Sequence, residues 1–224
     1  YKLYFENNEI DRDLLEINSK PLLFSELKSY DKNKYAYITD TKYCNSMHWL
    51  FSDQSKLNLI PKLININETF IIKLLDKNSD LFLSDFDDIQ QNIIKKLHHQ
   101  QIIILNSKNQ LIPNRLIIKA LNDFYENDCI CNKVYQKYLN SLNVHLDYKN
   151  SLFSDSEVDY LNFIMNKKQF SNGYDLRNKY IHGTQSINKD MHSYDYYLLL
   201  MIHCFIALKI YDEFANKKPY HATN

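Results

Sequence analysis

The sequence predicts a mainly α-helical protein: a C-terminal antiparallel bundle of four or five helices, preceded by a smaller part of mixed α/β structure. Apolar residues recur at helical spacing through most of the second half of the chain, and capping residues precede several of these runs. Only two glycines and four prolines interrupt the 224 residues. Runs of aromatic and β-branched residues typical of strands are short. Together these observations favour helices over sheets.

Two regions differ in how clearly they show these patterns. We expect residues 1–83 to form a mixed N-terminal segment of unknown role and residues 84–224 to form the helical domain. Within the first segment, composition indicates short strands at 1–5 and 34–39 and short helices at 11–17, 23–30 and 41–51. A further helix is expected over Asn67–Leu75, with Asn67 as its N-cap.

The region 84–113 reads as a helix followed by a short hairpin. Ser84 and Asp87 are placed to open the helix, and its apolar positions recur at helical spacing. The apolar runs 102–105 and 111–113 flank a polar turn, as in a hairpin. This order is what a winged-helix-like element would show, but so short a pattern is also found in ordinary α+β connectors, which is the favoured interpretation.

Helices follow from residue 114 to near the end of the chain. We expect helices over 114–125 and 132–142, then a loop over 143–152. Ser154 and Glu157 have the spacing of a capping box, which starts another helix. Gly173 permits the turn that leads on to a short helix ending near residue 183.

The last helix is expected to run to Phe214, capped by Ser186 or Asn188. Its apolar stretch over residues 196–208 is shorter than the ~20 residues that span a membrane, so no membrane partner is expected. We expect instead a core helix buried on most sides.

Composition narrows the classes of function. Lys and Arg total 27, as do Asp and Glu, so the chain has no global positive field with which to coat nucleic acid. The four cysteines match neither a zinc motif nor a secreted disulfide framework, which suggests the reducing cytoplasm. Two glycines are too few for phosphate-cradling or dinucleotide-binding loops. We expect neither a metal site nor a cofactor.

The segment Asp175–Gly183 concentrates residues with phosphate and proton chemistry. Arg177 always carries its charge, Asn178 adds an amide, and His182 supplies an imidazole able to exchange a proton near neutral pH. Cleavage of RNA without a metal needs such a phosphate clamp and proton carrier. On a regular helix Arg177 and His182 lie about 140° apart, so they do not point the same way.

The spacing Arg-Asn-x-x-x-His-Gly at residues 177–183, with the helix before it and the apolar helix after it, resembles the signature of the HEPN superfamily of prokaryotic defence and toxin ribonucleases. The resemblance covers residues 154–214. It implies a HEPN-like bundle and an active site in a two-fold cleft, where both copies of a homodimer supply arginine and histidine. HEPN toxins paired with a nucleotidyltransferase antitoxin often carry a tyrosine two residues after the histidine. Here that position is Thr184, so an abortive-infection type of protein is the better comparison.

We therefore expect a metal-independent endoribonuclease that acts by attack of the ribose 2'-hydroxyl. The predicted catalytic residues are Arg177 for the developing charge, His182 as base or acid, and Asn178 either orienting His182 or binding phosphate. The expected substrate-binding residues are the cation of Lys179 and two aromatic rings on which bases can stack, Tyr174 and Tyr180.

Two other interpretations of the same segment stay open. The chain could be a non-catalytic HEPN-like module for dimerisation or RNA binding, which regulates a partner encoded nearby or fused upstream of Tyr1. Alternatively the residues are structural: Asp175 and Lys179 form an i, i+4 ion pair, Arg177 bridges to a neighbour, and His182 is favoured by the dipole of its helix.

Overall fold

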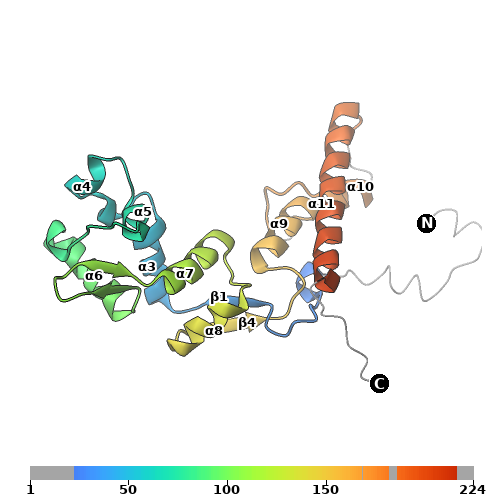
Figure 1. The fold of residues 1–224 in the computed structure, drawn as a ribbon. Helices are drawn as coiled ribbons and strands as arrows, with labels where there is room; N and C mark the ends of the chain where they lie inside the picture. Colours follow the sequence, from blue (N-terminus) through green and yellow to red (C-terminus); the bar gives the residue numbers. More distant parts are fainter. Residues whose placement is uncertain (1–22, 168, 182–185, 216–224) are drawn as a thin grey trace, which may run out of the picture. The chain divides into compact units, whose positions relative to one another are not determined.

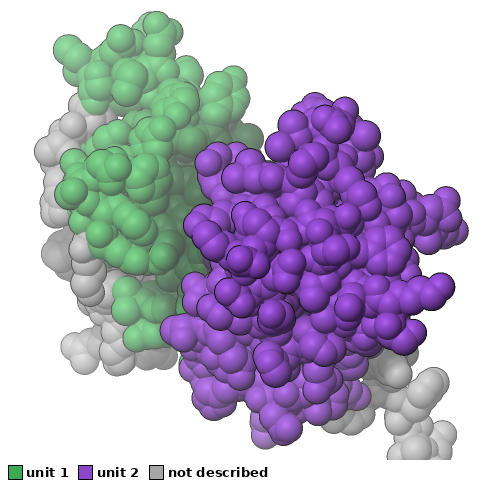
Figure 2. Space-filling view, turned by 90° about the vertical axis from the view of Figure 1, so that its left-hand side faces the viewer, with its two compact units in different colours: residues 1–30, 151–224 green, residues 31–150 purple. Residues whose placement is uncertain are grey.

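The computed structural model describes residues 23–167, 169–181 and 186–215. In this part of the chain the fold is mainly helical, with two small antiparallel sheets (Figure 1). It divides into two compact units, coloured separately in Figure 2. We call residues 31–150 the central unit. The described residues up to 30 and from 151 onward form the terminal unit.

The central unit contains most of the elements. In chain order they are β1 (Tyr35–Ile38), α3 (Thr41–Phe51), η2 (Lys56–Asn58), α4 (Pro61–Ile64), α5 (Phe70–Leu75), η3 (Leu83–Asp85), α6 (Asp88–His99), β2 (Ile103–Leu105), β3 (Leu111–Pro113), α7 (Arg115–Asn127), α8 (Lys133–Ser141) and β4 (Leu146–Lys149). The terminal unit contains η1 (Phe24–Glu26), α9 (Asp155–Met165), α10 (Leu176–Ile181) and α11 (Lys189–Ala215).

This division differs from the expected boundary between residues 83 and 84. Elements on both sides of that point share one core: Phe70 of α5 and Phe86, just before α6, meet edge to face at 5.9 Å between ring centroids. The helices after residue 114 also do not form one compact bundle, because α7 and α8 belong to the central unit and α9–α11 to the terminal unit.

Each sheet has two strands. The hairpin expected at 102–113 is confirmed: β2 and β3 pair with Ile103 opposite Pro113. The expected loop at 143–152 is wrong in part, since it contains β4, which pairs with β1 from Tyr35 opposite Lys149 to Ile38 opposite Leu146. The polar sequence of β4 does not indicate a strand, and its partner β1 lies more than 100 residues earlier in the chain.

Helix starts follow the capping chemistry of the sequence in most places. Asp87 and Gln90 form a capping box at α6, and Ser154 and Glu157 form the one expected at α9. The helix over 41–51 is confirmed as α3. The predicted cap at Asn67 is wrong: Asn67 adopts a left-handed conformation with φ 52°, and α5 begins at Phe70.

The remaining expectations in the first segment have mixed outcomes. The strand at 34–39 is confirmed as β1. The helix expected over 23–30 is wrong, because only the single turn η1 forms before residue 28 bridges to Ser151 in extended conformation. The strand at 1–5 and the helix at 11–17 lie outside the described residues.

The terminal unit is built around a core that η1, α9, α10 and α11 share. Its buried members are Leu152, Phe153, Leu161, Ile164, Leu176 and Ile202. The segment that precedes the central unit is hydrogen-bonded to the C-terminal end of α11, where Ser29 Oγ donates to the Glu213 carboxylate at 3.0 Å. This core holds α10, which carries the signature, beside α11 (Figure 1).

α11 is apolar on nearly all sides, but it is not buried on most sides as expected. Residues 195, 198, 199, 202, 205 and 206 recur at helical spacing and face the unit's core. Large apolar side chains on the rest of the helix are exposed, among them Tyr197 (66%) and Leu208 (62%). No helix in the described part of the chain has the length and apolar character needed to cross a membrane.

Candidate functional site

The signature helix α10 is held in place by a tight turn that depends on Gly173. A Cβ atom on Gly173 would lie 2.6 Å from the backbone oxygen of Phe163 in α9. The glycine therefore lets the backbones approach closely, and the next amide, of Tyr174, donates to that same Phe163 oxygen at 2.9 Å. The Tyr174 ring packs edge to face on Phe163, with 5.6 Å between centroids.

A buried side chain and a side-chain hydrogen bond fix the first turn of α10. Leu176 is buried in the core of the terminal unit, and Asp175 before it adopts a left-handed conformation with φ 57°. The side-chain amide of Asn178 donates to Asp175 Oδ1 at 2.7 Å. The amide nitrogen of Asn178 thus stabilises the start of its own helix, and a role of this residue in orienting His182 or binding phosphate stays a prediction.

Arg177 is exposed on α10. Within the part of the chain that the structure describes, its guanidinium has neither a hydrogen bond nor an ion pair. The alternative in which Arg177 bridges to a neighbour therefore finds no support among these residues. Five guanidinium N–H donors remain available for a phosphate.

Lys179 does not form the expected ion pair with Asp175. Its ammonium lies 3.7 Å from Asp195 Oδ1 of α11. The cation predicted to bind substrate is therefore turned toward a carboxylate of its own chain. Lys179 keeps partial exposure, with 30% of its side chain open to solvent.

The predicted residues at the end of the motif, His182, Gly183 and Thr184, lie outside the described residues. The described members Arg177, Asn178, Lys179 and Tyr180 lie on α10, and Tyr174 precedes it. The geometry that follows concerns this group and the side chains of α11 that meet it.

Tyr180 connects α10 to two side chains of α11. Its hydroxyl donates to Asp195 Oδ2 at 3.1 Å and lies 3.2 Å from His192 Nδ1. Burial, and then the hydrogen bond to the Asp195 carboxylate, raise the pKa of Tyr180 above its usual 10.0. The phenol therefore remains protonated and acts as a hydrogen-bonding link.

A second tyrosine pair lies beside this group. The hydroxyls of Tyr174 and Tyr194 are 3.1 Å apart. This hydrogen bond is the main cause that raises the pKa of Tyr194 above its usual value, and burial adds to it. Tyr174 and Tyr180 are 37% and 39% exposed, so their rings remain partly accessible for stacking with bases.

Sequence reasoning missed His192, Tyr194 and Asp195. Asp195 did leave a signal, because it is the single acidic residue among positions 195, 198, 199, 202, 205 and 206, which face the core. A lone carboxylate in a buried apolar stripe is costly and therefore indicates a specific role. His192 could be found only with the structure, since its link to the motif passes through Tyr180.

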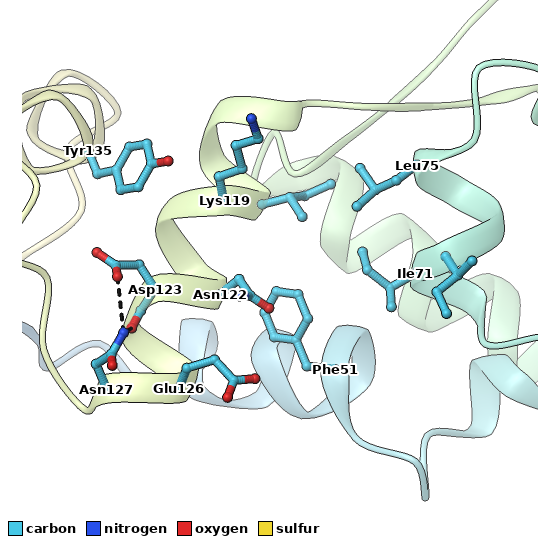
Figure 3. Close-up of a pocket in the computed structure, with 11 residues that line it drawn as sticks. Phe51, Ile71, Leu75, Lys119, Asn122, Asp123, Glu126, Asn127 and Tyr135 are labelled. Carbon is cyan, nitrogen blue, oxygen red and sulfur yellow. Dashed lines mark hydrogen bonds between the residues drawn. The ribbon is translucent and has the colours of Figure 1, made fainter.

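A separate hollow of about 510 Å³ lies in the central unit (Figure 3). Phe51, Ile71 and Leu75 line one side, and polar side chains of α7 line the other. Among the latter is Asp123, whose pKa is raised by burial although Asn127 donates to it. The lining contains no histidine, cysteine, serine or threonine and none of the predicted site residues.

Among the described residues, no three histidine, cysteine, aspartate or glutamate side chains gather closely enough to hold a metal ion. No protein-family model, curated protein or solved structure matches this chain.

Proposed function

We propose that this protein is a metal-independent endoribonuclease of the prokaryotic defence or toxin type, with a HEPN-like site built on α10. Attack of a ribose 2'-hydroxyl on the adjacent phosphate would give a 2',3'-cyclic phosphate and a free 5'-hydroxyl. Arg177 would stabilise the negative charge that develops on the phosphate, and His182 would transfer a proton.

The observation that carries this proposal is the exposure of Arg177 without a partner in the described structure. An exposed guanidinium keeps its planar set of N–H donors available for paired contacts with a phosphate. Here the guanidinium is open to solvent within an Arg-Asn-x-x-x-His-Gly sequence, and the half-exposed rings of Tyr174 and Tyr180 flank it. A cation and aromatic rings together suit single-stranded RNA.

We further propose that the active form is a homodimer joined along α11. Large apolar side chains of this 27-residue helix are exposed from Met191 to Phe214, with a few polar side chains between them. Soluble proteins rarely leave so large an apolar surface open, and a two-fold axis lets the same helix cover itself. Such a dimer would place two copies of the motif near one another, as the HEPN resemblance implies.

A non-catalytic HEPN-like module is the second candidate, and one observation favours it. The exposed apolar surface of α11 would support dimerisation without requiring any chemistry. In that case the exposed Arg177 would bind RNA, or a regulatory partner, and cleave nothing.

RNA cleavage in EDTA separates these candidates. The purified chain should cut single-stranded RNA and spare DNA of the same sequence. Arg177→Ala should lower the cleavage rate by about 10²–10³-fold, the usual cost of losing one donor to a developing anion. Lys95→Ala is the matched control, because it removes one exposed positive charge from α6 in the other unit, and it should retain the parental rate.

The same assay contains the result that would reject the enzyme. An intact dimer that binds RNA in a filter assay but leaves it uncut would favour the binding module. Equal activity of the Arg177→Ala and parental proteins would show that α10 is not part of the active site.

A further inference from the structure

A row of hydrogen bonds joins His192 to Asp195 through Tyr180. Tyr180 has a single hydroxyl proton, and it donates that proton to Asp195 Oδ2 at 3.1 Å. It must therefore accept a hydrogen bond from His192 Nδ1, 3.2 Å away. This arrangement places the ring proton of neutral His192 on Nδ1 and leaves the lone pair on Nε2. A histidine in this tautomer can accept a proton at Nε2.

The row reaches α10 on the side that carries Arg177. Tyr180 follows Arg177 by three residues, and residues three apart are neighbours on a helix surface. His182 follows Arg177 by five residues, which on a regular helix is about 140° around the axis. His192 is therefore an imidazole linked to the Arg177 side of α10 within one chain.

Burial of the Asp195 carboxylate, at the end of this row, costs folding free energy. Asp195 is only 4% exposed, and its Oδ1 has no hydrogen-bond partner in the described structure. Lys179, 3.7 Å away, provides charge compensation but no hydrogen bond. A buried, half-satisfied carboxylate lowers stability relative to an apolar residue. Folding alone does not account for it, whereas orienting Tyr180 and His192 does.

We propose that His192 is the general base of the reaction, and that Tyr180 and Asp195 are residues that position it. This inference rests on the ribonuclease function proposed above. His192 Nε2 takes the proton of the 2'-hydroxyl while the 2'-oxygen forms its bond to phosphorus. The bond from phosphorus to the 5'-oxygen breaks, that oxygen takes a proton from solvent, and protonated His192 then releases its proton to solvent. No water, oxidant or reductant is consumed.

The other candidate bases in this group are unsuitable. Tyr180 holds its proton more tightly than usual, because burial and the nearby carboxylate raise its pKa. Asp195 is buried beneath Tyr180 and cannot meet a ribose. His192 is half-buried, so part of this residue is exposed to solvent.

The test compares cleavage rates in EDTA for the full chain and its variants. His192→Ala should cut RNA about 10²–10⁴-fold more slowly, the usual contribution of a general base. His99→Ala is the matched control: this histidine is exposed at the end of α6 in the central unit, so it lies outside both the motif and α11. It should cleave at the parental rate.

Added imidazole distinguishes proton transfer from a structural role. It should restore part of the activity of His192→Ala, because the free base can occupy the space left by the missing ring. Tyr180→Phe and Asp195→Asn should lose on the order of 10²-fold in rate by misplacing the ring, and imidazole should not restore them. Thermal unfolding of each variant verifies that it folds.

The outcomes separate this inference from the function on which it rests. A parental protein that does not cleave RNA overturns both. A cleaving parent with an equally active His192→Ala variant overturns the role of His192 alone. Loss of activity in a folded His192→Ala variant that imidazole does not restore would assign His192 a structural role and overturn the inference too.

Discussion

At the scale of single residues, the buried carboxylate of Asp195 lowers the stability of the fold while it serves the proposed function. Within the described residues its Oδ1 has no hydrogen-bond partner, and an unsatisfied buried polar group costs about 1–3 kcal/mol. We predict that Asp195→Leu does not lower the free energy of unfolding measured in urea, although it removes the anchor of Tyr180. Ile202→Ala, at a buried apolar position of the same helix, should cost about 2–5 kcal/mol. Equal losses in the two variants would show that Asp195 serves the fold.

Asp123 gives a prediction for the dependence of stability on pH. Burial raises its folded-state pKa above 3.8, its usual value. As pH rises through the window between these two values, the unfolded state releases its proton first and stability falls. Asp123→Asn keeps the acceptor for Asn127 and removes the charge. Its unfolding free energy should equal or exceed that of the parent at pH 7, and this advantage should vanish below the window. A variant less stable than the parent at pH 7 would contradict this.

At the scale of elements, the turn before α10 depends on a contact that admits only glycine. In Gly173→Ala the new methyl group would meet the Phe163 oxygen at 2.6 Å, a backbone atom that cannot move aside cheaply. We predict a loss of about 1–3 kcal/mol in unfolding free energy, as for other overpacked sites. Asn172→Ala, next to it and exposed, should change stability by less than about 0.5 kcal/mol. Similar stability of the two variants would mean that the turn is loose.

Elements with strong local signals were predictable, and those that depend on distant partners were not. Capping residues located the starts of α6 and α9, and the paired apolar runs located the hairpin of β2 and β3. β4 escaped because its sequence is polar and β1 alone gives it a partner. In the candidate site, Arg177 was evident from residue type, whereas His192 required knowledge of which turn of α11 faces Tyr180.

At the scale of the whole molecule, α11 determines the expected assembly. We predict that the chain is a dimer by light scattering and that Tyr197→Glu or Leu208→Glu makes it a monomer, because a buried carboxylate would oppose association. Val134→Glu is the control, since this side chain is 61% exposed on α8 in the central unit, and it should leave the dimer intact. A monomeric parent would reject the two-fold site.

The division into two units suggests how the molecule separates its tasks. The terminal unit contains all the described residues of the predicted site, whereas the hollow lined by α7 belongs to the central unit. The expected boundary at residue 83 missed this because the chain leaves the terminal unit early and returns to it at residue 151. Sequence patterns are local, so they do not show which separated segments share a core.

The central claim is that α10 supports cleavage of RNA by its own 2'-hydroxyl. Its most direct test is to identify the ends of the fragments formed in EDTA from an RNA, and from the same RNA with one 2'-deoxy residue at the cut position. We predict 2',3'-cyclic phosphate and 5'-hydroxyl ends from the RNA and no cut at the deoxy position. Fragments with 5'-phosphate ends, or cleavage at the deoxy position, would contradict the mechanism.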